Sequence, residues 1–413
     1  MNMLALARLG LLVAEGVIGL AVLYLCIIAC SAMIATFVRP RRPVGGVPRQ
    51  ESSPLDFVVV IPAHDEEAGL GTLLDGLSRQ SYPRDHYTVC VVADNCTDRT
   101  AQLARQHAGV RVYERRDETL RGKGHALRWA FERLEAEQLL RYEACLVLDA
   151  DAVVAPSLLD AFARVLRQGA QAVQGQYLVL NPRASASAAL RWVALALANH
   201  VRPLGRSALG ASASITGNGF CLTRGLLRAH PWSAFGLIED YQYYLSLVEH
   251  GIRVQYAPDA QVLSAMPITF SQQRSQDIRW ESMGAGQEST RRIAWRLLAG
   301  AVRARDLVRL EAFIELVTPP LSALVFWSIA LVAAAAALRA PLALTGGLAL
   351  LAGLIWYVSS AFVLLRPPGA VYQALIFAPW YMLRKVWILA VVRRRTRETS
   401  AWVRTSRAMP QDD

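Results

Sequence analysis

The chain has 413 residues, of which 54% are hydrophobic and only 19% charged, and its mean hydropathy is +0.26. This length allows two or three domains, and the composition predicts that part of the chain lies in a bilayer. The net charge of +11 gathers beside hydrophobic segments, at 39–42 and 393–407, which fits anionic lipid headgroups better than nucleic acid. The sequence shows no aromatic-studded basic module, so we expect no nucleic acid partner. Its cysteines lack metal-ligand spacing, which disfavours a zinc site and predicts a reducing, cytosolic setting.

An apolar run from Leu9 to Phe37 opens the chain and is followed at once by Arg39, Arg41 and Arg42. This run is about twice the length of a signal-peptide core, and it is long enough to cross a membrane. We therefore predict an N-terminal transmembrane anchor over 1–38. The arginines place the following part in the cytoplasm by the positive-inside rule. The segment 39–55, rich in Pro, Gly and Ser, is predicted to be a linker.

Short apolar runs alternate with helical patterns over 56–270, the predicted catalytic domain. This alternation predicts an α/β fold with a mostly parallel sheet covered on both faces. Strands are expected at 57–61, 88–93, 110–113, 144–148 and 172–179, and helices at 66–79, 98–107, 124–139 and 157–167.

The C-terminal part is predicted to be membrane-bound. Segment 271–311 mixes arginines with Trp and Leu, which indicates amphipathic helices in the membrane interface. Two apolar runs within 312–366 are joined by a short link and predict a transmembrane helical hairpin, the first helix kinked at Pro319-Pro320. Segment 367–392 is expected to be interfacial or re-entrant, with a third C-terminal membrane helix as the alternative. The basic tail 393–413 is expected in the cytosol, which requires three spanning helices in total.

Two aspartates, Asp149 and Asp151, follow directly on the apolar run 144–148. In open α/β sheets ligands bind at the carboxyl ends of strands. Two carboxylates one residue apart can offer hard oxygen ligands to Mg²⁺ or Mn²⁺ carrying substrate phosphates. The alternative is a plain strand-to-turn transition with Asp as turn former. An isolated Asp-x-Asp leaves both interpretations open.

Acids also end two other predicted strands. An acidic cluster that includes Glu66 follows Pro62, and Asp94 ends the next strand. Each cluster alone is explained by a favourable helix N-terminus. Because the carboxyl ends of parallel strands meet at one edge of a sheet, we expect Glu66, Asp94 and Asp149 to converge there.

Lys123 is flanked by Gly122 and Gly124, and Lys385 is the only other lysine of the chain. A buried diphosphate with one divalent ion still carries negative charge, which a lysine can balance. An exposed lysine at a helix start is the alternative. Similarly, the pair Glu239-Asp240 is either an acidic helix start or a catalytic pair.

Together these stretches resemble the membrane-bound family 2 glycosyltransferases, the group that includes cellulose, hyaluronan and chitin synthases. The resemblance covers about 57–280 and implies a GT-A-like, Rossmann-type cytosolic domain with flanking membrane helices. Seven stretches carry it in the family's order: Pro62 to Glu67, Val92 to Asp98, Gly122 to Leu127, Asp149 to Asp151, Thr216 to Phe220, Glu239-Asp240 and Gln276 to Trp280.

The resemblance also implies roles for the residues that match. Donor nucleotide contacts fall on Pro62, Glu66, Asp94, Lys123, Asp149, Gln276, Arg279 and Trp280. Among these, Glu66 and Asp94 would hold the uridine end, and Asp149 would approach the ribose or the sugar. Asp151 would bind the divalent metal, Mg²⁺ or Mn²⁺, that bridges the diphosphate.

For catalysis, the resemblance implies that Asp240, beside Glu239, is the general base. Asn218, Phe220 and Trp280 would contact the acceptor. Asp277 stands where the family often has Arg after the Gln. The implied reaction is an inverting, metal-dependent transfer from a nucleotide-sugar, expected to be a UDP-sugar, to a lipid or lipid-linked glycan.

Two alternatives remain open at this point. A processive synthase would extrude a polysaccharide, and a non-enzyme scaffold would only sense nucleotide-sugars. We expect a multi-pass protein of the inner (plasma) membrane, with its catalytic domain in the cytoplasm and oligomerisation possible.

Overall fold

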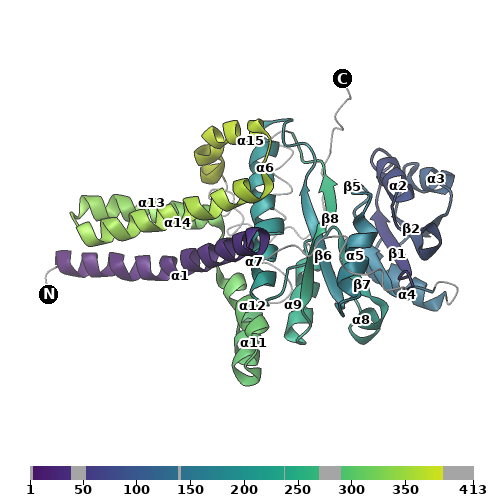
Figure 1. Ribbon diagram of the computed structural model, residues 1–413, viewed down its shortest axis with the longest axis horizontal. Helices are drawn as coiled ribbons and strands as arrows, with labels where there is room; N and C mark the ends of the chain where they lie inside the picture. Colours follow the sequence, from purple (N-terminus) through teal and green to yellow (C-terminus); the bar gives the residue numbers. More distant parts are fainter. Residues whose placement is uncertain (1–2, 39–52, 138–140, 237, 269–289, 385–413) are drawn as a thin grey trace.

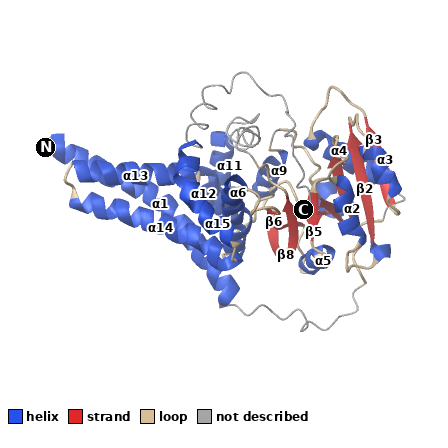
Figure 2. Cartoon of the chain, turned by 90° about the horizontal axis from the view of Figure 1, so that it is seen from above, coloured by secondary structure: helices blue, strands red, loops and turns tan. Residues whose placement is uncertain are grey.

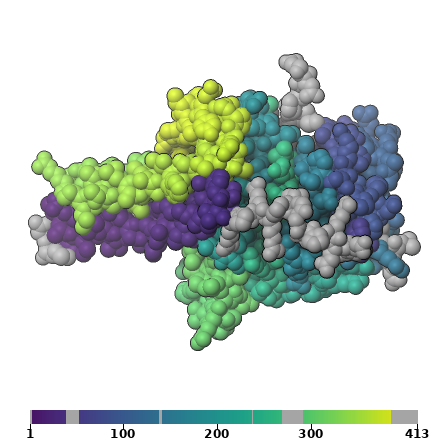
Figure 3. Space-filling view, in the orientation of Figure 1, coloured from purple at the N-terminus to yellow at the C-terminus, as the bar shows by residue number. Residues whose placement is uncertain are grey.

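The computed structural model describes residues 3–38, 53–137, 141–236, 238–268 and 290–384. A bundle of long helices projects from one side of an α/β domain (Figure 1). The space-filling view shows the same bundle as a rod built from both ends of the chain, helix α1 (Met3–Phe37) in purple and later helices in green (Figure 3).

An eight-stranded sheet forms the centre of the α/β domain, in the order β3-β2-β1-β4-β7-β6-β8-β5. Its strands are β1 (Phe57–Ala63), β2 (Tyr87–Asp94), β3 (Val110–Arg115), β4 (Ala144–Val147), β5 (Ala152–Val154), β6 (Ala172–Val179), β7 (Phe220–Thr223) and β8 (Val254–Ser264). Each strand predicted from the sequence is present, and the α/β prediction is confirmed.

The sheet is mostly parallel, as predicted, and only β7 and β5 run against the other six strands. Strands β3, β2, β1 and β4 run parallel, but β7 is antiparallel to both β4 and β6, and β5 is antiparallel to β8. Strand β6 pairs in parallel with β8. The sequence predicts neither the short strand β7 nor its direction, because four apolar residues carry no directional signal.

Helices cover both faces of the sheet (Figure 2). They are α2 (Leu70–Ser78), the 3₁₀ turn η1 (Arg84–His86), α3 (Thr100–Gln106), α4 (Lys123–Ala136), α5 (Leu158–Leu166), α8 (Arg224–Ala229) and α9 (Glu239–Glu249). In β1, Val58 and Val60 point into one hydrophobic core, and Val59 and Ile61 into the other. This two-residue alternation is why a strand buried on both faces has an unbroken apolar sequence.

A long helix joins the α/β domain to the membrane helices. It runs through α6 (Ala186–Ala196), the π-helical turn η2 (Leu197–Val201) and α7 (Arg202–Ala208). Helix α7 crosses α1 closely, because a Cβ placed on Gly205 would lie 2.1 Å from the carbonyl oxygen of Ile28. Only glycine allows this crossing distance.

The bundle contains α1, α13 (Leu321–Ala337) and α14 (Pro341–Leu365). Two described helices, α1 and α14, are long and apolar enough to cross a membrane. A third crossing is added if α12 (Leu307–Val317) and α13 form one bent span, with an angle of 63° between them. The break falls at the predicted kink, since proline removes a backbone N–H from the helix.

Two further elements flank the base of the bundle. Helix α11 (Thr290–Ala304) precedes α12. On the other side, α15 (Gly369–Ala374) and the 3₁₀ turn η4 (Leu375–Phe377) lie beside α6 (Figure 1). The basic tail lies outside the described residues.

Candidate active site

The carboxyl ends of β1, β2 and β4 lie side by side, as the sequence predicts. In the register of the sheet, Pro62 is opposite Val92 on β2, and Val60 is opposite Val147 on β4. Asp94 is the last residue of β2. Glu66 and Asp149 follow β1 and β4 within three residues. The backbone therefore brings all three acids to one edge of the sheet.

Asp94 is buried in an ion pair with Arg115, which ends the neighbouring strand β3. Nη1 of Arg115 lies 2.6 Å from Oδ1 of Asp94, and their side chains are only 5% and 8% exposed. Burial raises the pKa of Asp94, and the hydrogen bond and charge of Arg115 oppose that rise. The sequence analysis missed Arg115. Asp94 and Arg115 end adjacent parallel strands and are direct register partners, a pairing that the sequence of either strand alone does not reveal.

Asp149-Ala-Asp151 forms the turn between β4 and β5. The backbone N–H of Ala152 donates to the carbonyl oxygen of Asp149 at 3.0 Å. The segment is therefore a turn, and it also presents two carboxylates at the ligand-binding edge. A Cβ placed on Gly69 would lie 3.4 Å from Cα of Asp151, so the start of helix α2 packs against this turn.

Lys123 begins helix α4, and its ammonium group points at the Asp149 turn. Nζ lies 2.5 Å from Oδ1 of Asp149 and also donates to the carbonyl oxygen of Gly217. Burial by itself lowers the pKa of Lys123, but the charges of Asp149 and Glu239 outweigh it and raise the pKa. Lys123 is therefore a fixed cation at the centre of the acidic edge.

The acid pair Glu239-Asp240 begins helix α9 on the other side of Gly217. A Cβ placed on Gly217 would lie 2.8 Å from Oδ2 of Asp240 and 3.9 Å from Nζ of Lys123. Burial, together with the charge of Asp240, raises the pKa of Glu239 to about 7. Burial also raises the pKa of Asp240, against the opposing charge of Lys123. The pair is thus poised to exchange a proton near neutral pH.

Asn218 and Phe220 support this arrangement from below. The Asn218 side chain is fully buried, and its Oδ1 accepts from the backbone N–H of Asp149 at 3.0 Å. Phe220 is also fully buried and stacks on Trp232 with ring centroids 6.0 Å apart. Both side chains are buried in this structure, and their predicted contacts with an acceptor stay a prediction. Asn218 positions Asp149, and Phe220 packs in the core.

One group of possible metal ligands lies among the described residues, next to the expected site. Ligand atoms of Asp65, Cys96 and Asp98 lie within 4.8 Å of one another. However, Oδ1 of Asp65 already accepts backbone N–H groups from Thr97 at 2.7 Å and Asp98 at 3.2 Å. These bonds tie the loop after β1 to the loop after β2. The Asp149 to Asp151 turn offers two more carboxylates at this edge, of which Oδ1 of Asp149 is already paired with Lys123.

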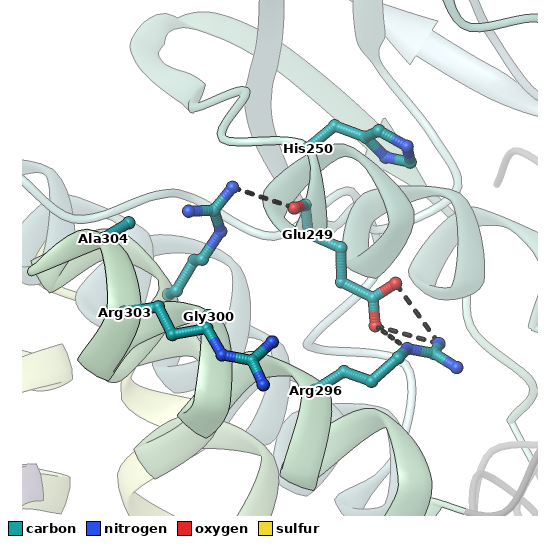
Figure 4. A pocket seen from close by; sticks show the side chains of 7 residues that line it. Glu249, His250, Arg296, Gly300, Arg303 and Ala304 are labelled. Atoms are coloured by element: carbon teal, nitrogen blue, oxygen red, sulfur yellow. Dashed lines mark hydrogen bonds and ion pairs between the residues drawn. The ribbon is translucent and has the colours of Figure 1, made fainter.

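The predicted donor and acceptor residues Gln276, Arg279 and Trp280 lie outside the described residues. The far end of helix α9 borders a separate hollow of about 360 Å³ (Figure 4). Arg296 lies there 3.0 Å from Glu249, and Arg309 donates to the carbonyl oxygen of Glu249 at 3.0 Å. This hollow is a full helix length from Glu239, so it is distinct from the acidic edge.

Comparison with known proteins supports the same assignment. Residues 54–282, more than half of the chain, match the family model described as "Glycosyltransferase like family 2". The chain is 27% identical over 221 residues to the beta-monoglucosyldiacylglycerol synthase of Nostoc sp., covering 52% of this chain and 45% of that protein. It is 26% identical over 203 residues to the 4,4'-diaponeurosporenoate glycosyltransferase of Staphylococcus haemolyticus, covering 47% and 52%. The chain thus spans about half the length of these curated relatives.

Among solved structures, the chain resembles a mannosyltransferase from Pyrobaculum calidifontis in complex with GDP-Man and Mn²⁺. The TM-score is 0.54 at 19% identity, covering 96% of this chain and 100% of that one. This likeness confirms the GT-A-like fold. The family match covers the edge built from Asp94, Lys123, Asp149 and the Glu239-Asp240 pair. The chain therefore belongs to the family 2 glycosyltransferases, enzymes that transfer a sugar from a nucleotide-sugar.

Proposed function

We propose that this enzyme transfers a sugar from a UDP-sugar to a membrane lipid or lipid-linked acceptor, with inversion at the anomeric carbon. The observation that carries the proposal is the buried pair Glu239-Asp240, placed across Gly217 from the Lys123 cation. Direct displacement needs a carboxylate near the acceptor hydroxyl and positive charge near the departing diphosphate. This edge supplies both.

On the donor side, Asp94 would accept hydrogen bonds from the uracil end, held in orientation by Arg115. Glu66 and Pro62 would line the same end. Asp149 would approach the ribose or the sugar, and Asp151 would hold Mg²⁺ or Mn²⁺. When bound, the ion would neutralise charge on the diphosphate, and Lys123 would balance the remainder. Gln276, Arg279 and Trp280 are proposed to contact the donor, and Trp280 also the acceptor.

On the acceptor side, Asp240 would remove the proton of the attacking hydroxyl. The C–O bond to the acceptor forms as the bond to the diphosphate breaks, and the proton passes to Oδ of Asp240. The raised pKa of Asp240 suits this task, because a more basic carboxylate accepts a proton more readily. Burial and the negative charge of Asp240 raise the pKa of the neighbouring Glu239.

A lipid acceptor is supported by the candidate membrane helices and by the similarity to a beta-monoglucosyldiacylglycerol synthase and a 4,4'-diaponeurosporenoate glycosyltransferase. With at most three candidate spans among the described residues, one chain offers few helices to enclose a polysaccharide channel. A processive synthase, the second candidate, would instead give a product ladder. Sizing the radiolabelled product separates the two, since a single addition excludes processivity.

The membrane placement is also part of the proposal. The active site would face the cytoplasm, and α11 would lie in the membrane interface. The exposed face of α11 carries Arg291, Arg292 and Arg303 beside Trp295 and Val302, the last two 67% and 71% exposed. Cationic and aromatic side chains of this kind suit anionic headgroups.

Turnover tests the whole proposal. Purified enzyme in nanodiscs is offered UDP-glucose, UDP-galactose, UDP-N-acetylglucosamine or GDP-mannose, with diacylglycerol or polyprenyl phosphate, and with Mg²⁺, Mn²⁺ or EDTA. We expect UDP release and a lipid product with one UDP-sugar, lost in EDTA. Turnover only with the GDP-sugar would overturn the donor assignment, and turnover in EDTA would overturn the metal assignment.

A further inference from the structure

A buried network of charged and hydroxyl groups lies where the membrane helices meet the α/β domain. Arg206 on α7 is 1% exposed, and its Nε lies 2.6 Å from Oε1 of Glu311 on α12. One of its terminal nitrogens donates to Tyr244 on α9 at 2.8 Å, and the other donates to Ser214 at 2.8 Å. A single guanidinium thus joins three separate elements of the chain.

The same network extends into the membrane helices. The hydroxyl of Tyr24 on α1 lies 2.6 Å from Glu311 and 2.9 Å from Glu315. Arg202 donates to Glu315 at 3.0 Å and to the hydroxyl of Tyr357 on α14 at 2.8 Å. Helices α1, α12 and α14 are therefore bonded, through Arg202 and Arg206, to the helix α7 that contacts α9.

Stability alone does not explain these charges. Buried ion pairs are commonly no more stabilising than well-packed apolar residues of the same size. Buried ion pairs of arginine do select one arrangement, because the donors of a planar guanidinium point in only a few fixed directions. At this junction the arrangement selected is the position of α9 relative to the membrane helices.

Helix α9 carries the acid pair at its first turn. Tyr244 is four residues after Asp240, so the two side chains lie one above the other on the same helix face. Asp240 is already tightly placed, with Oδ2 2.8 Å from the position of a Cβ on Gly217. A small displacement of α9 therefore moves the base relative to Lys123 and Gly217. Displacements of about 1 Å in a catalytic group can lower rates about 100-fold.

We propose that Arg206 is a positioning residue for transfer, and that Tyr24, Glu311 and Tyr244 complete a link from the membrane helices to the acid pair. Through this link, the geometry of Asp240 depends on the seating of α1 and α12. The proposal rests on the proposed function, because it assumes that Asp240 is the base. It adds that the membrane helices determine the geometry of the active site as well as anchoring the α/β domain.

The test removes single hydroxyls and leaves every charge in place. Deleting Arg206 would strand Glu311 as a buried anion and is expected to unfold the junction. Tyr244→Phe and Tyr24→Phe each remove one hydroxyl of the network with little change in volume. Tyr243→Phe is the control on α9, since its hydroxyl donates to the carbonyl of His230 outside the network. Thr36→Val is the control on α1, because Thr36 bonds only within its own helix.

In full-length enzyme in nanodiscs, we expect Tyr244→Phe and Tyr24→Phe each to lower kcat about tenfold. The KM for the donor should stay within about twofold, because the uridine end is held elsewhere. The double variant should lose little more than either single variant, as expected for residues of one network. Both controls should keep kcat within about twofold. Equal losses in Tyr243→Phe and Tyr244→Phe, or additive losses in the double variant, would overturn the proposal.

Hydrogen exchange gives a second readout that needs no turnover. Tyr24→Phe on α1 should speed exchange of the first-turn amides of α9 about tenfold, and Thr36→Val should leave them unchanged. No change in α9 with Tyr24→Phe would refute the link. Turnover retained by Asp240→Asn would instead refute the base assignment, while the exchange result would still report on the link.

Discussion

Lys123 controls the protonation of the acid pair, and replacing it should move the pH dependence of catalysis. The two distances from a Cβ on Gly217, 2.8 Å to Oδ2 of Asp240 and 3.9 Å to Nζ of Lys123, limit the separation of these charged atoms. At the largest separation that these two distances allow, about 6–7 Å, two unit charges interact by about 2.5 kcal/mol at an effective dielectric of 20 and by about 0.6 kcal/mol in water. Lys123 is 23% exposed, so we expect a value between these limits.

The direction of the shift follows from the charges. Lys123 lowers the pKa values of Asp240 and Glu239 against the effect of burial. Lys123→Gln removes that cation, so both pKa values rise further. Because a base is inactive when protonated, the acid limb of kcat/KM should move to higher pH, by about one unit. The wild-type limb should lie above the ordinary range of a carboxyl group, because burial raises the pKa of Asp240.

The assay is kcat/KM for the donor from pH 5 to 9, which reports on groups of the free enzyme. Lys123→Arg is the matched control. It keeps the charge, and its acid limb should stay in place even though the guanidinium cannot reproduce both contacts of the ammonium group. An acid limb that stays in place or moves to lower pH in Lys123→Gln would refute the electrostatic argument.

Four further predictions follow from the same geometry. Gly217→Ala should lower kcat at least tenfold, because the backbone φ of +80° disfavours a side chain and the added Cβ would lie 2.8 Å from Oδ2 of Asp240. The control Gly225→Ala should keep wild-type kcat, because a Cβ at that position meets no atom within 4 Å. Arg115→Met should lower the free energy of unfolding by about 3–5 kcal/mol, because it leaves the buried carboxylate of Asp94 without its cation. Adding Asp94→Leu should restore most of this loss, and chemical denaturation measures both variants. Asn218→Ala should lower donor affinity in calorimetry with little change in fold, because it frees the backbone of Asp149, and unchanged affinity would contradict this role. Asp151→Ala should abolish the Mn²⁺-dependent rise in Tm caused by UDP, and a rise that persists would place the metal elsewhere.

The ends of the strands could be predicted from the sequence. Burial on both faces makes each strand an unbroken apolar run, and these runs stop at acidic residues. Asp94 and Asp149 were predicted on this basis and Lys123 from its place between two glycines, and the structure brings all three to one edge. The bend between α12 and α13 could also be predicted, since Pro319-Pro320 must interrupt the helix.

Other features depend on contacts between residues far apart in the sequence. The Arg115 partner of Asp94 depends on sheet register, which a single strand does not encode. The burial of Phe220 against Trp232 also depends on the antiparallel pairing of β7 with β4, which the sequence of the short strand does not reveal. The Arg206 network joins helices more than 100 residues apart, so charge pattern alone gave no sign of it.

The central claim is that Asp240 is the base for transfer, and Asp240→Asn tests it most directly. The measurement pairs the rate of lipid glycosylation with calorimetric binding of UDP and Mn²⁺ to the same preparation. We predict that transfer falls at least about 1000-fold while binding stays within about threefold, because the amide keeps the shape of the side chain but accepts no proton. Transfer within about tenfold of wild type, with binding intact, would contradict the account.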